Sequence, residues 1–311
     1  MITKNLLRSF SAVPVSNMLK KDIIRNKHVY IMLIPVVVYY LVFHYVPMYG
    51  AIIAFKEFSP AAGILGSKWI GLEQFKSFFS SYYFGRILRN TLLLSVYNLV
   101  FSFPLPIILA ILLNSLKNAW FKKTVQTISY LPHFISTVVI CGMITSFLSS
   151  KGLINQLLGS STLFMSTPEY FRTIYISSDI WQHLGWNSVI YIAALSTVDM
   201  ELYDAAAVDG AGRWHKIIHI ELQCLLPTIV ILLILRIGSI MSVGFEKVLL
   251  LYNTSTYETA DIISTFVYRK GILQMNYSYS AAVGLFNSVI NFILLITANK
   301  ISRQFQETSL W

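Results

Sequence analysis

The chain has 311 residues, of which 55% are hydrophobic and only 12% charged, with a net charge of +10. Soluble domains carry about 25% charged residues, so this composition leaves too little polar surface for a water-soluble body. The basic residues lie in short segments between long apolar runs, a pattern typical of membrane topology rather than of nucleic-acid binding. We therefore expect an integral membrane protein that has the lipid bilayer as its surroundings and no nucleic-acid partner.

Six segments have the roughly 20 largely apolar residues that a membrane-spanning helix needs. The apolar run that follows the basic N-terminal segment is too long for a cleavable signal, so the first span is expected to be retained. Pro104 and Pro106 are expected to kink the second span. The six predicted spans are 29–54, 87–113, 124–148, 174–198, 224–244 and 279–299.

The distribution of basic residues predicts which side each loop occupies. If the N-terminus is cytoplasmic, the inner segments hold 13 Lys and Arg residues and the outer segments, which are longer, hold 10. The higher basic density of the inner segments favours this orientation. We expect a cytoplasmic tail at 1–28, a single membrane domain at 29–301 and a second cytoplasmic tail at 302–311.

The segment after the fourth predicted span has the composition of a short helix with a small surface. Asp204 can accept hydrogen bonds from the first turn of a helix, and Ala205, Ala206 and Ala207 follow with little side-chain bulk. Gly210 and Gly212 can end the helix because glycine tolerates positive φ. A helix near 203–213 is therefore expected, which a groove on another protein could enclose.

The same segment resembles the EAA loop of bacterial ABC-importer permeases. In that family the loop reads Glu-Ala-Ala, three residues, Gly, nine residues and then Ile-x-Leu-Pro. Here Asp204-Ala205-Ala206 is followed by Asp209-Gly210-Ala211 and by Ile220-x-Leu222, with Glu201-Leu202-Tyr203 leading in. Other stretches resemble the sugar and oligosaccharide branch of the family, notably 90–92, 122–127, 130–132, 277–279, 282–286 and the terminal Trp311.

The resemblance implies a fold and a set of partners. It implies an all-α polytopic protein of a bacterial cell membrane with six transmembrane helices. It also implies a cytoplasmic coupling helix in the loop 201–223, and a separate ATPase moves this helix. It implies a second homologous permease, with a heterodimer expected, as well as two ATPase subunits and an extracytoplasmic binding protein. The expected substrate is an oligosaccharide, with uronate-containing fragments the nearest resemblance. The coupling residues carried over are Glu201, Asp204, Ala205, Ala206, Asp209, Gly210 and Ala211.

The loop departs from the family pattern at two positions. Asp204 stands where the family usually has Glu, and it keeps the charge on a shorter side chain. Gln223 stands where the family usually has Pro, and Pro227 follows four residues later. Because proline bends a helix, its loss at 223 is expected to relax the kink between the loop and the fifth span.

No nucleotide-binding or hydrolase motif is present in the sequence. There is no GxxxxGK[ST], HExxH or GxSxG pattern. Cys141 and Cys224 lack the spacing of a metal site or a disulfide framework. We therefore expect no enzymatic activity and no cofactor, with ATP bound by the partner subunits. The alternatives are an ion-gradient-driven secondary transporter and an ABC permease for a non-sugar solute.

Polar and aromatic residues within the spans are candidates for the substrate path. Arg236 lies within a span and is expected either to pair with a substrate carboxylate or to form a structural ion pair or hydrogen bonds with a neighbouring helix. Trp186 and Asn187 suit either sugar binding or packing. Trp181 fits the interfacial aromatic belt better than the path. Asp179, His183 and Glu246 are expected to lie at the membrane interface rather than to form a proton relay.

Overall fold

The computed structural model describes residues 22 and 24–305, and almost all of the secondary structure in this part is helical. Most of the predicted N-terminal tail and the residues from 306 onward, including Trp311, lie outside the described residues. Four helices are long and apolar enough to cross a membrane, and a bent pair makes a fifth candidate span. The all-α polytopic class predicted from the sequence is confirmed.

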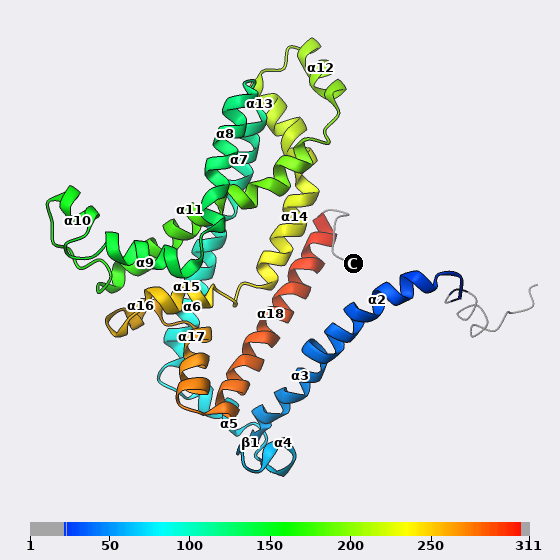
Figure 1. Ribbon diagram of the computed structural model, residues 1–311. Helices are drawn as coiled ribbons and strands as arrows, with labels where there is room; N and C mark the ends of the chain where they lie inside the picture. The colour runs from blue at the N-terminus through cyan, green and yellow to red at the C-terminus, as the bar shows by residue number, and fades with distance from the viewer. Residues whose placement is uncertain (1–21, 23, 306–311) are drawn as a thin grey trace, which may run out of the picture.

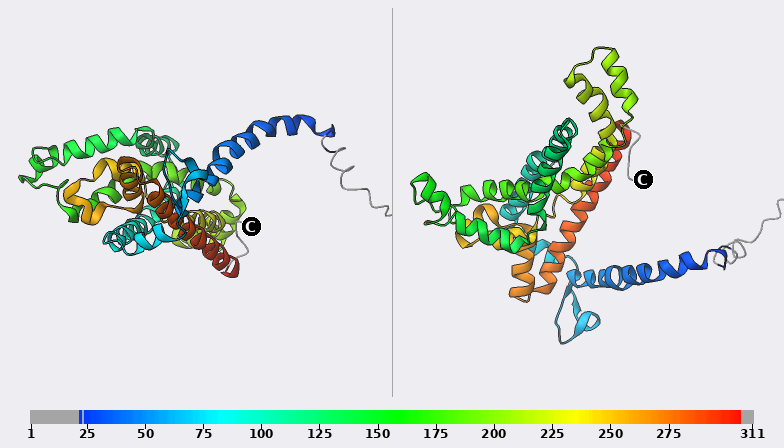
Figure 2. Two further views of the ribbon diagram at one scale, coloured as in Figure 1. Left: turned by 90° about the horizontal axis from the view of Figure 1, so that it is seen from below. Right: turned by 45° about the horizontal axis from the view of Figure 1, so that its top comes forward.

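The first span is an apolar run that projects away from the other helices. It consists of α2 (Lys27–Tyr40), a π-helical turn η1 (Leu41–Tyr45), α3 (Val46–Met48) and a 3₁₀ segment η2 (Tyr49–Phe55). None of the residues in its apolar window is buried within the described chain. Figures 1 and 2 show α2 diverging from the other helices in every view. The first span contacts the rest of the chain through η2, which packs against α18.

A small hairpin and two short helices connect the first span to the second. Strands β1 (Lys56–Glu57) and β2 (Lys68–Trp69) pair antiparallel around α4 (Gly63–Gly66), and α5 (Glu73–Phe79) follows. The ring of Trp69 stacks on that of Phe55 with centroids 5.7 Å apart. Figure 1 places these elements at one end of the molecule.

The second span changes its helical register at its midpoint. It comprises α6 (Phe84–Tyr97), the π-helical turn η3 (Asn98–Ser102) and α7 (Pro104–Asn114). Proline lacks an amide hydrogen and cannot continue the hydrogen-bond ladder, so Pro104 accounts for an irregularity at this point. The irregularity falls where the sequence predicted a kink.

The third predicted span, 124–148, is not one straight helix. α8 (Ala119–Tyr130) with the 3₁₀ turn η4 (Leu131–Phe134) and α9 (Thr137–Phe147) meet at an angle of 95°. Pro132 lies in the turn. Ser136 is the N-cap of α9, and its side chain accepts a hydrogen bond from the amide of Val139. Pro132 and Ser136 are visible in the sequence as a helix breaker and a helix cap. The bend was not predicted, because the apolar composition continues through both residues.

The fourth predicted span is α11 (Pro168–Leu195), a helix of 28 residues that follows the short α10 (Leu153–Leu158). Apart from Ile176, which is adjacent to Tyr175, its buried residues recur at intervals of three or four, so they form one stripe along the helix. The helix packs against α7, α8, α14 and α16. The stripe consists of Phe171, Tyr175, Ile176, Ser178, Gln182, Gly185, Ser188, Tyr191 and Leu195.

The loop and the fifth span follow at the opposite end from β1 and α5. α12 (Met200–Val208) leads through a turn to α13 (Arg213–Lys216), the π-helical turn η5 (Ile217–Glu221) and α14 (Leu222–Gly238). Arg213–Gly238 is one continuous apolar helix, so the span begins eleven residues before the predicted position of 224. Gln223 supplies the backbone N–H that a proline would lack, and Pro227, four residues later, lies inside α14 without ending it.

Short helices join the fifth span to the last one. They are α15 (Phe245–Leu251), η6 (Thr254–Thr256), α16 (Tyr257–Ala260), α17 (Ile263–Tyr268) and η7 (Arg269–Leu273). The last span is α18 (Tyr277–Phe305), which packs along α14. Asp261 is fully buried between these elements and pairs with Arg269 at 2.6 Å and Arg86 at 3.4 Å, so one carboxylate ties α6 to the segment 254–273.

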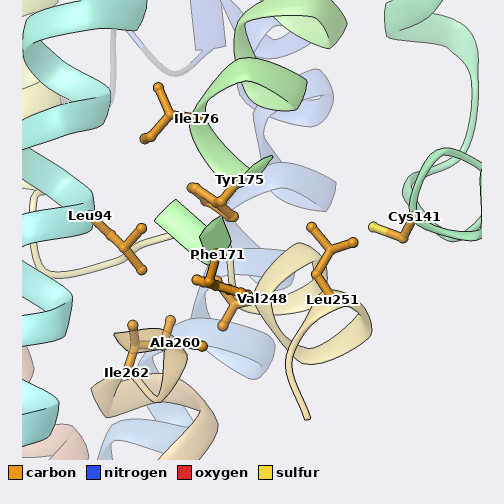
Figure 3. Close-up of a cluster of buried hydrophobic side chains, with 9 residues drawn as sticks. All are labelled: Leu94, Cys141, Phe171, Tyr175, Ile176, Val248, Leu251, Ala260 and Ile262. Carbon is orange, nitrogen blue, oxygen red and sulfur yellow. The ribbon is translucent and has the colours of Figure 1, made fainter. Parts of the chain in front are cut away.

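The buried core is formed where α11 crosses the short helices. Phe171, Tyr175 and Ile176 of α11 pack with residues from α6, α9 and α15 (Figure 3). A second cluster joins α7, α11 and α14 around Tyr191 and Leu225. α11 therefore contributes to both of these clusters, whereas a third cluster, around Phe78 and Phe266, joins α5, α6, α17 and α18 without it.

Candidate functional site: an exposed loop helix and a polar cavity

The helix α12 begins and ends differently from the prediction. Its N-cap is Asp199, whose carboxylate accepts a hydrogen bond from the Glu201 amide at 3.0 Å. Asp204 is the fifth residue of the helix and is exposed, so its predicted capping role is wrong. A stronger signal was available five residues earlier, because Asp199 precedes the run and Glu201 follows in its first turn.

The C-terminal end of α12 agrees with the expected role of glycine. Gly210 has φ +72°, and its amide donates to the carbonyl of Ala207 at 3.1 Å, while the Ala211 amide donates to Ala206 at 2.8 Å. This pair of bonds is a Schellman motif, which needs a residue with positive φ at the position of Gly210. The helix therefore ends at Val208, earlier than the predicted 213.

The surface of α12 is exposed and partly apolar. The side chains of Met200, Leu202 and Val208 are exposed, Val208 by 89%. Glu201, Ala205 and Asp209 are also exposed, whereas Ala206 and Ala211 are half-buried. Figure 1 shows α12 protruding beyond the ends of α7 and α8. An apolar helix surface that protrudes in this way is typical of a protein-docking site.

A cavity of about 820 Å³ lies between the second, fourth and fifth spans. Arg236, Trp186 and Asn187, all predicted for the path, line it together with Asp179 and His183. Trp181 is absent from its lining and is 48% exposed. Glu246 is exposed beside the buried Lys247, so Asp179 and His183 face the cavity and Glu246 does not.

A chain of polar contacts crosses the wall of this cavity. Asn98 donates to Asp179 Oδ2 at 2.8 Å and accepts a hydrogen bond from the guanidinium of Arg236. Asp179 also lies 3.3 Å from His183 Nδ1 and 3.8 Å from Lys247 Nζ. The π-helical turn η3 carries Asn98 and so places an amide between a cation and a carboxylate.

Two members of this network were not predicted from the sequence. Lys247 is only 4% exposed and donates to Gln182 at 3.2 Å. It was assigned to an outer loop, because its neighbours Phe245 and Glu246 do not distinguish a buried lysine from an exposed one. Asn98 interrupts an apolar run and is 6% exposed, and that interruption was the signal that could have identified it.

Aromatic rings form another part of the wall. The His133 ring stacks on Trp186 with centroids 4.6 Å apart and an interplanar angle of 3°. Phe134 meets the same tryptophan edge-on at 5.6 Å. His133 and Phe134 lie in η4, the turn where the third span bends, so the 95° bend brings this turn against α11.

The fold and the site together define a polytopic helical transport protein with a protruding loop helix. The chain belongs to the family described as binding-protein-dependent transport system inner membrane component, whose model matches residues 76–306. It is thus a permease subunit of an ABC importer, a transporter component and not an enzyme.

Relatives and solved structures agree with this assignment. The chain is 45% identical to Protein LplB of Bacillus subtilis (strain 168), with 92% of each chain covered. It is 44% identical to the polygalacturonan/rhamnogalacturonan transport system permease protein YteP of the same organism, over 93% of this chain and 92% of that protein.

A crystal structure of a bacterial ABC transporter involved in the import of the acidic polysaccharide alginate matches with a TM-score of 0.86. The identity is 44%, and the match covers 92% of this chain and 99% of that one. A structure of the bacterial alginate ABC transporter in complex with an alginate pentasaccharide-bound periplasmic protein matches equally well, at 43% identity and TM-score 0.86, over 93% and 99% of the two chains.

Proposed function

We propose that this permease forms the translocation path for a uronate-containing oligosaccharide that an extracytoplasmic binding protein delivers. The observation that carries the proposal is the cavity wall, where a guanidinium, an amide and a tryptophan ring lie together. YteP is named as a polygalacturonan/rhamnogalacturonan transport permease, and the alginate transporter is described as importing an acidic polysaccharide; both are similar to this chain over nearly its whole length.

Arg236 supplies the charge for recognising a carboxylate. Its hydrogen bond goes to the neutral amide of Asn98, and no carboxylate within the described residues lies within 4.0 Å of its guanidinium. The carboxylate of Asp179 is instead shared between Lys247 and His183. This arrangement favours the substrate-pairing interpretation of Arg236 over the structural ion pair, because planar guanidinium groups bind carboxylates in a two-pronged geometry.

Trp186 and Asn187 suit the remaining surface of a sugar. An aromatic face held parallel to a second ring presents a flat apolar surface to the C–H groups of a pyranose. Asn187, which lines the same cavity, offers amide donors and acceptors for hydroxyl groups. Trp181 remains a candidate for the membrane interface, since it is exposed and lies away from this cavity.

The proposed partners account for the exposed surfaces of the chain. The coupling residues Glu201, Asp204, Ala205, Ala206, Asp209, Gly210 and Ala211 lie on or beside α12, which would seat in one of two ATPase subunits that bind ATP. α2 has no buried residue within the described chain, which fits contact with lipid and with a second, non-identical permease.

The expected sidedness agrees with the arrangement of the connections. α12 and the α7–α8 connection lie at the same end in Figure 1, and β1 and α5 lie at the other. Both connections at the α12 end belong to segments that the basic-residue density assigned to the cytoplasm. We therefore propose that α12 is cytoplasmic. The basic-residue density supports the same side for the tails 1–28 and 302–311, which flank a membrane domain at 29–301.

Uptake by the complete complex in proteoliposomes tests the substrate class. Arg236→Gln should weaken uptake of a uronate oligosaccharide by about tenfold or more, because a charge-assisted hydrogen bond is lost. Uptake of a neutral oligosaccharide of the same length should change by less than twofold. Trp181→Phe, outside the cavity, serves as the matched control. Equal losses for the acidic and the neutral sugar would rule out charge pairing by Arg236.

The energy source separates the proposal from its alternatives. Uptake should stop when ATP hydrolysis is blocked by vanadate while an ion gradient is maintained. Uptake that continues would establish an ion-gradient-driven secondary transporter. ATP-dependent uptake of a peptide or a phosphate ester, with no response to sugars, would establish an ABC permease for a non-sugar solute.

A further inference from the structure

Glu221 is a buried carboxylate at the base of the loop, outside the seven coupling residues. It is the last residue of η5, immediately before α14, and it is only 5% exposed. A charged side chain at this depth is costly unless its oxygens are paired. Its position corresponds to the variable x in Ile220-x-Leu222, so the family pattern does not assign it a function.

One oxygen of Glu221 joins three separate helices. Oε1 accepts hydrogen bonds from Asn114 Nδ2 at 3.0 Å and from the Tyr203 hydroxyl at 3.2 Å. Asn114 is the last residue of α7, and Tyr203 lies in the middle of α12. The amide of Asn114 also lies 3.4 Å from the Tyr203 hydroxyl, so the three side chains form a closed triangle.

The triangle connects α12 to two spans through side chains. Most of α12 is exposed, and Tyr203 is one of its two half-buried residues, the other being Ala206. Lys216 of α13 adds a bond to the Tyr203 carbonyl at 3.3 Å. Burial, and then the nearby Glu221 charge, raises the pKa of Tyr203 to about 12, so the phenol keeps its proton and donates at neutral pH.

The second oxygen of Glu221 is buried, and it accepts no hydrogen bond from the described part of the chain. An unpaired buried acceptor is costly, and it persists where the surroundings hold the group in place. Oε1, the partnered oxygen, bonds to α7 and α12, so these two helices hold the carboxylate in its position at the start of α14.

We propose that Glu221, Tyr203 and Asn114 form a clamp that makes α12 move as one body with the ends of α7 and α14. Glu221 is then a positioning residue, because it touches neither substrate nor nucleotide. The clamp transmits the displacement of α12 to two spans that line the cavity. The inference rests on the proposed ATPase docking of α12, and it adds the element that carries the motion into the membrane.

The transported sugar per ATP hydrolysed, measured with the complete complex in proteoliposomes, tests the clamp. Tyr203→Phe removes a single hydroxyl from a half-buried ring and should lower this ratio about tenfold, while ATP hydrolysis and subunit composition stay within twofold of wild type. Glu221→Ala should give a similar loss. The double variant should be no worse than Glu221→Ala, because the two residues act as one unit.

Conservative variants distinguish the clamp from a general loss of folding. Glu221→Gln keeps the acceptor oxygen and should restore the ratio to within about threefold of wild type. Tyr170→Phe, at an exposed tyrosine remote from α12, should leave it unchanged. A normal ratio for Tyr203→Phe would overturn the clamp, and so would loss of the ATPase subunits from that variant, which would make Tyr203 a docking residue.

The wild-type complex separates the clamp from the function on which it rests. If wild-type uptake is independent of ATP, the proposed function fails and the clamp fails with it. If wild-type uptake needs ATP but Tyr203→Phe transports normally, the clamp alone is wrong.

Discussion

The first span and α11 differ in opposite directions between their apolar composition and their burial in the structure. The run Lys27–Phe55 has the length and apolar character expected of a membrane span, yet none of the residues in its apolar window is buried within the described chain. α11 carries Asp179, Gln182 and His183 and is not among the helices that qualify as spans by composition, yet it packs against most of the others.

The contrast shows what hydropathy measures in a transport protein. An apolar surface all round a helix records the lipid or the neighbouring subunit that it faces. A helix that lines a path must present polar groups and pack closely, so its apolar signal is the weakest of the set. α11, which does not qualify as a span by composition, therefore contributes residues to the cavity wall.

The largest expected change in stability follows from a substitution of the charged residue Asp179 in α11. Asp179→Asn removes the carboxylate that lies beside Lys247, whose side chain is 5% exposed, and leaves a buried ammonium without its counter-charge. The free energy of unfolding should fall by about 3–5 kcal/mol. Thermal unfolding of the purified permease in detergent, followed by circular dichroism, measures this loss.

The double variant Asp179→Asn, Lys247→Met is the control for that loss. It removes both charges and should recover most of the stability, because no buried charge is left unpaired. A single variant with unchanged stability would mean that water reaches Lys247 in the permease, and the charged pair would then not constrain α11.

A glycine in each helix tests close packing at a smaller scale. A Cβ atom at Gly185 would lie 2.1 Å from the backbone oxygen of Ser129 in α8, whereas at Gly50 of the first span nothing lies within 4 Å. Gly185→Ala should destabilise the chain by about 1–3 kcal/mol through forced backbone shifts. Gly50→Ala should be neutral or slightly stabilising, since it lowers the entropy of the unfolded chain.

Melting temperatures of the two alanine variants, measured in one detergent, give the comparison directly. Similar melting temperatures for both would show that α8 can retreat from α11 at little cost. The cavity wall formed by His133 and Trp186 would then be adjustable rather than rigid, because the turn η4 that follows α8 would move with it.

The fold class and the loop were predictable because they depend on local composition. Apolar runs reveal spans, and the alanine-rich segment with Gly210 specifies a short helix with a Schellman end. The start of α12 was misplaced because Asp204, directly before the alanine run, was taken as the cap in place of Asp199, which has Glu201 in the first turn after it. The same limitation hid the bend near Pro132, where composition continues through a change of direction.

The cavity could be predicted only in part, because its groups converge from distant positions. Arg236, Trp186 and Asn187 were identifiable as polar or aromatic residues in apolar surroundings. The pairing of Asn98 with Asp179 joins residues 81 positions apart, and the contact between Arg236 and Asn98 joins residues 138 apart. No periodicity within one span carries that information. Asn98 could be recognised as a polar interruption of an apolar run, but its partners follow only from the packing of the second span against α11.

Substitutions in α2 are expected to change the stability of the isolated chain least. Val37→Ala and Val38→Ala shorten two side chains that are 42% and 50% exposed, so the unfolding free energy of the permease purified alone should change by less than about 0.5 kcal/mol. In the complete importer the same pair should reduce co-purification of the second permease, because α2 would lose packing against it. Quantifying both on one preparation sharpens the contrast with α11. Destabilisation of the isolated chain would show that α2 packs on its own bundle, and unchanged co-purification would leave lipid as its neighbour.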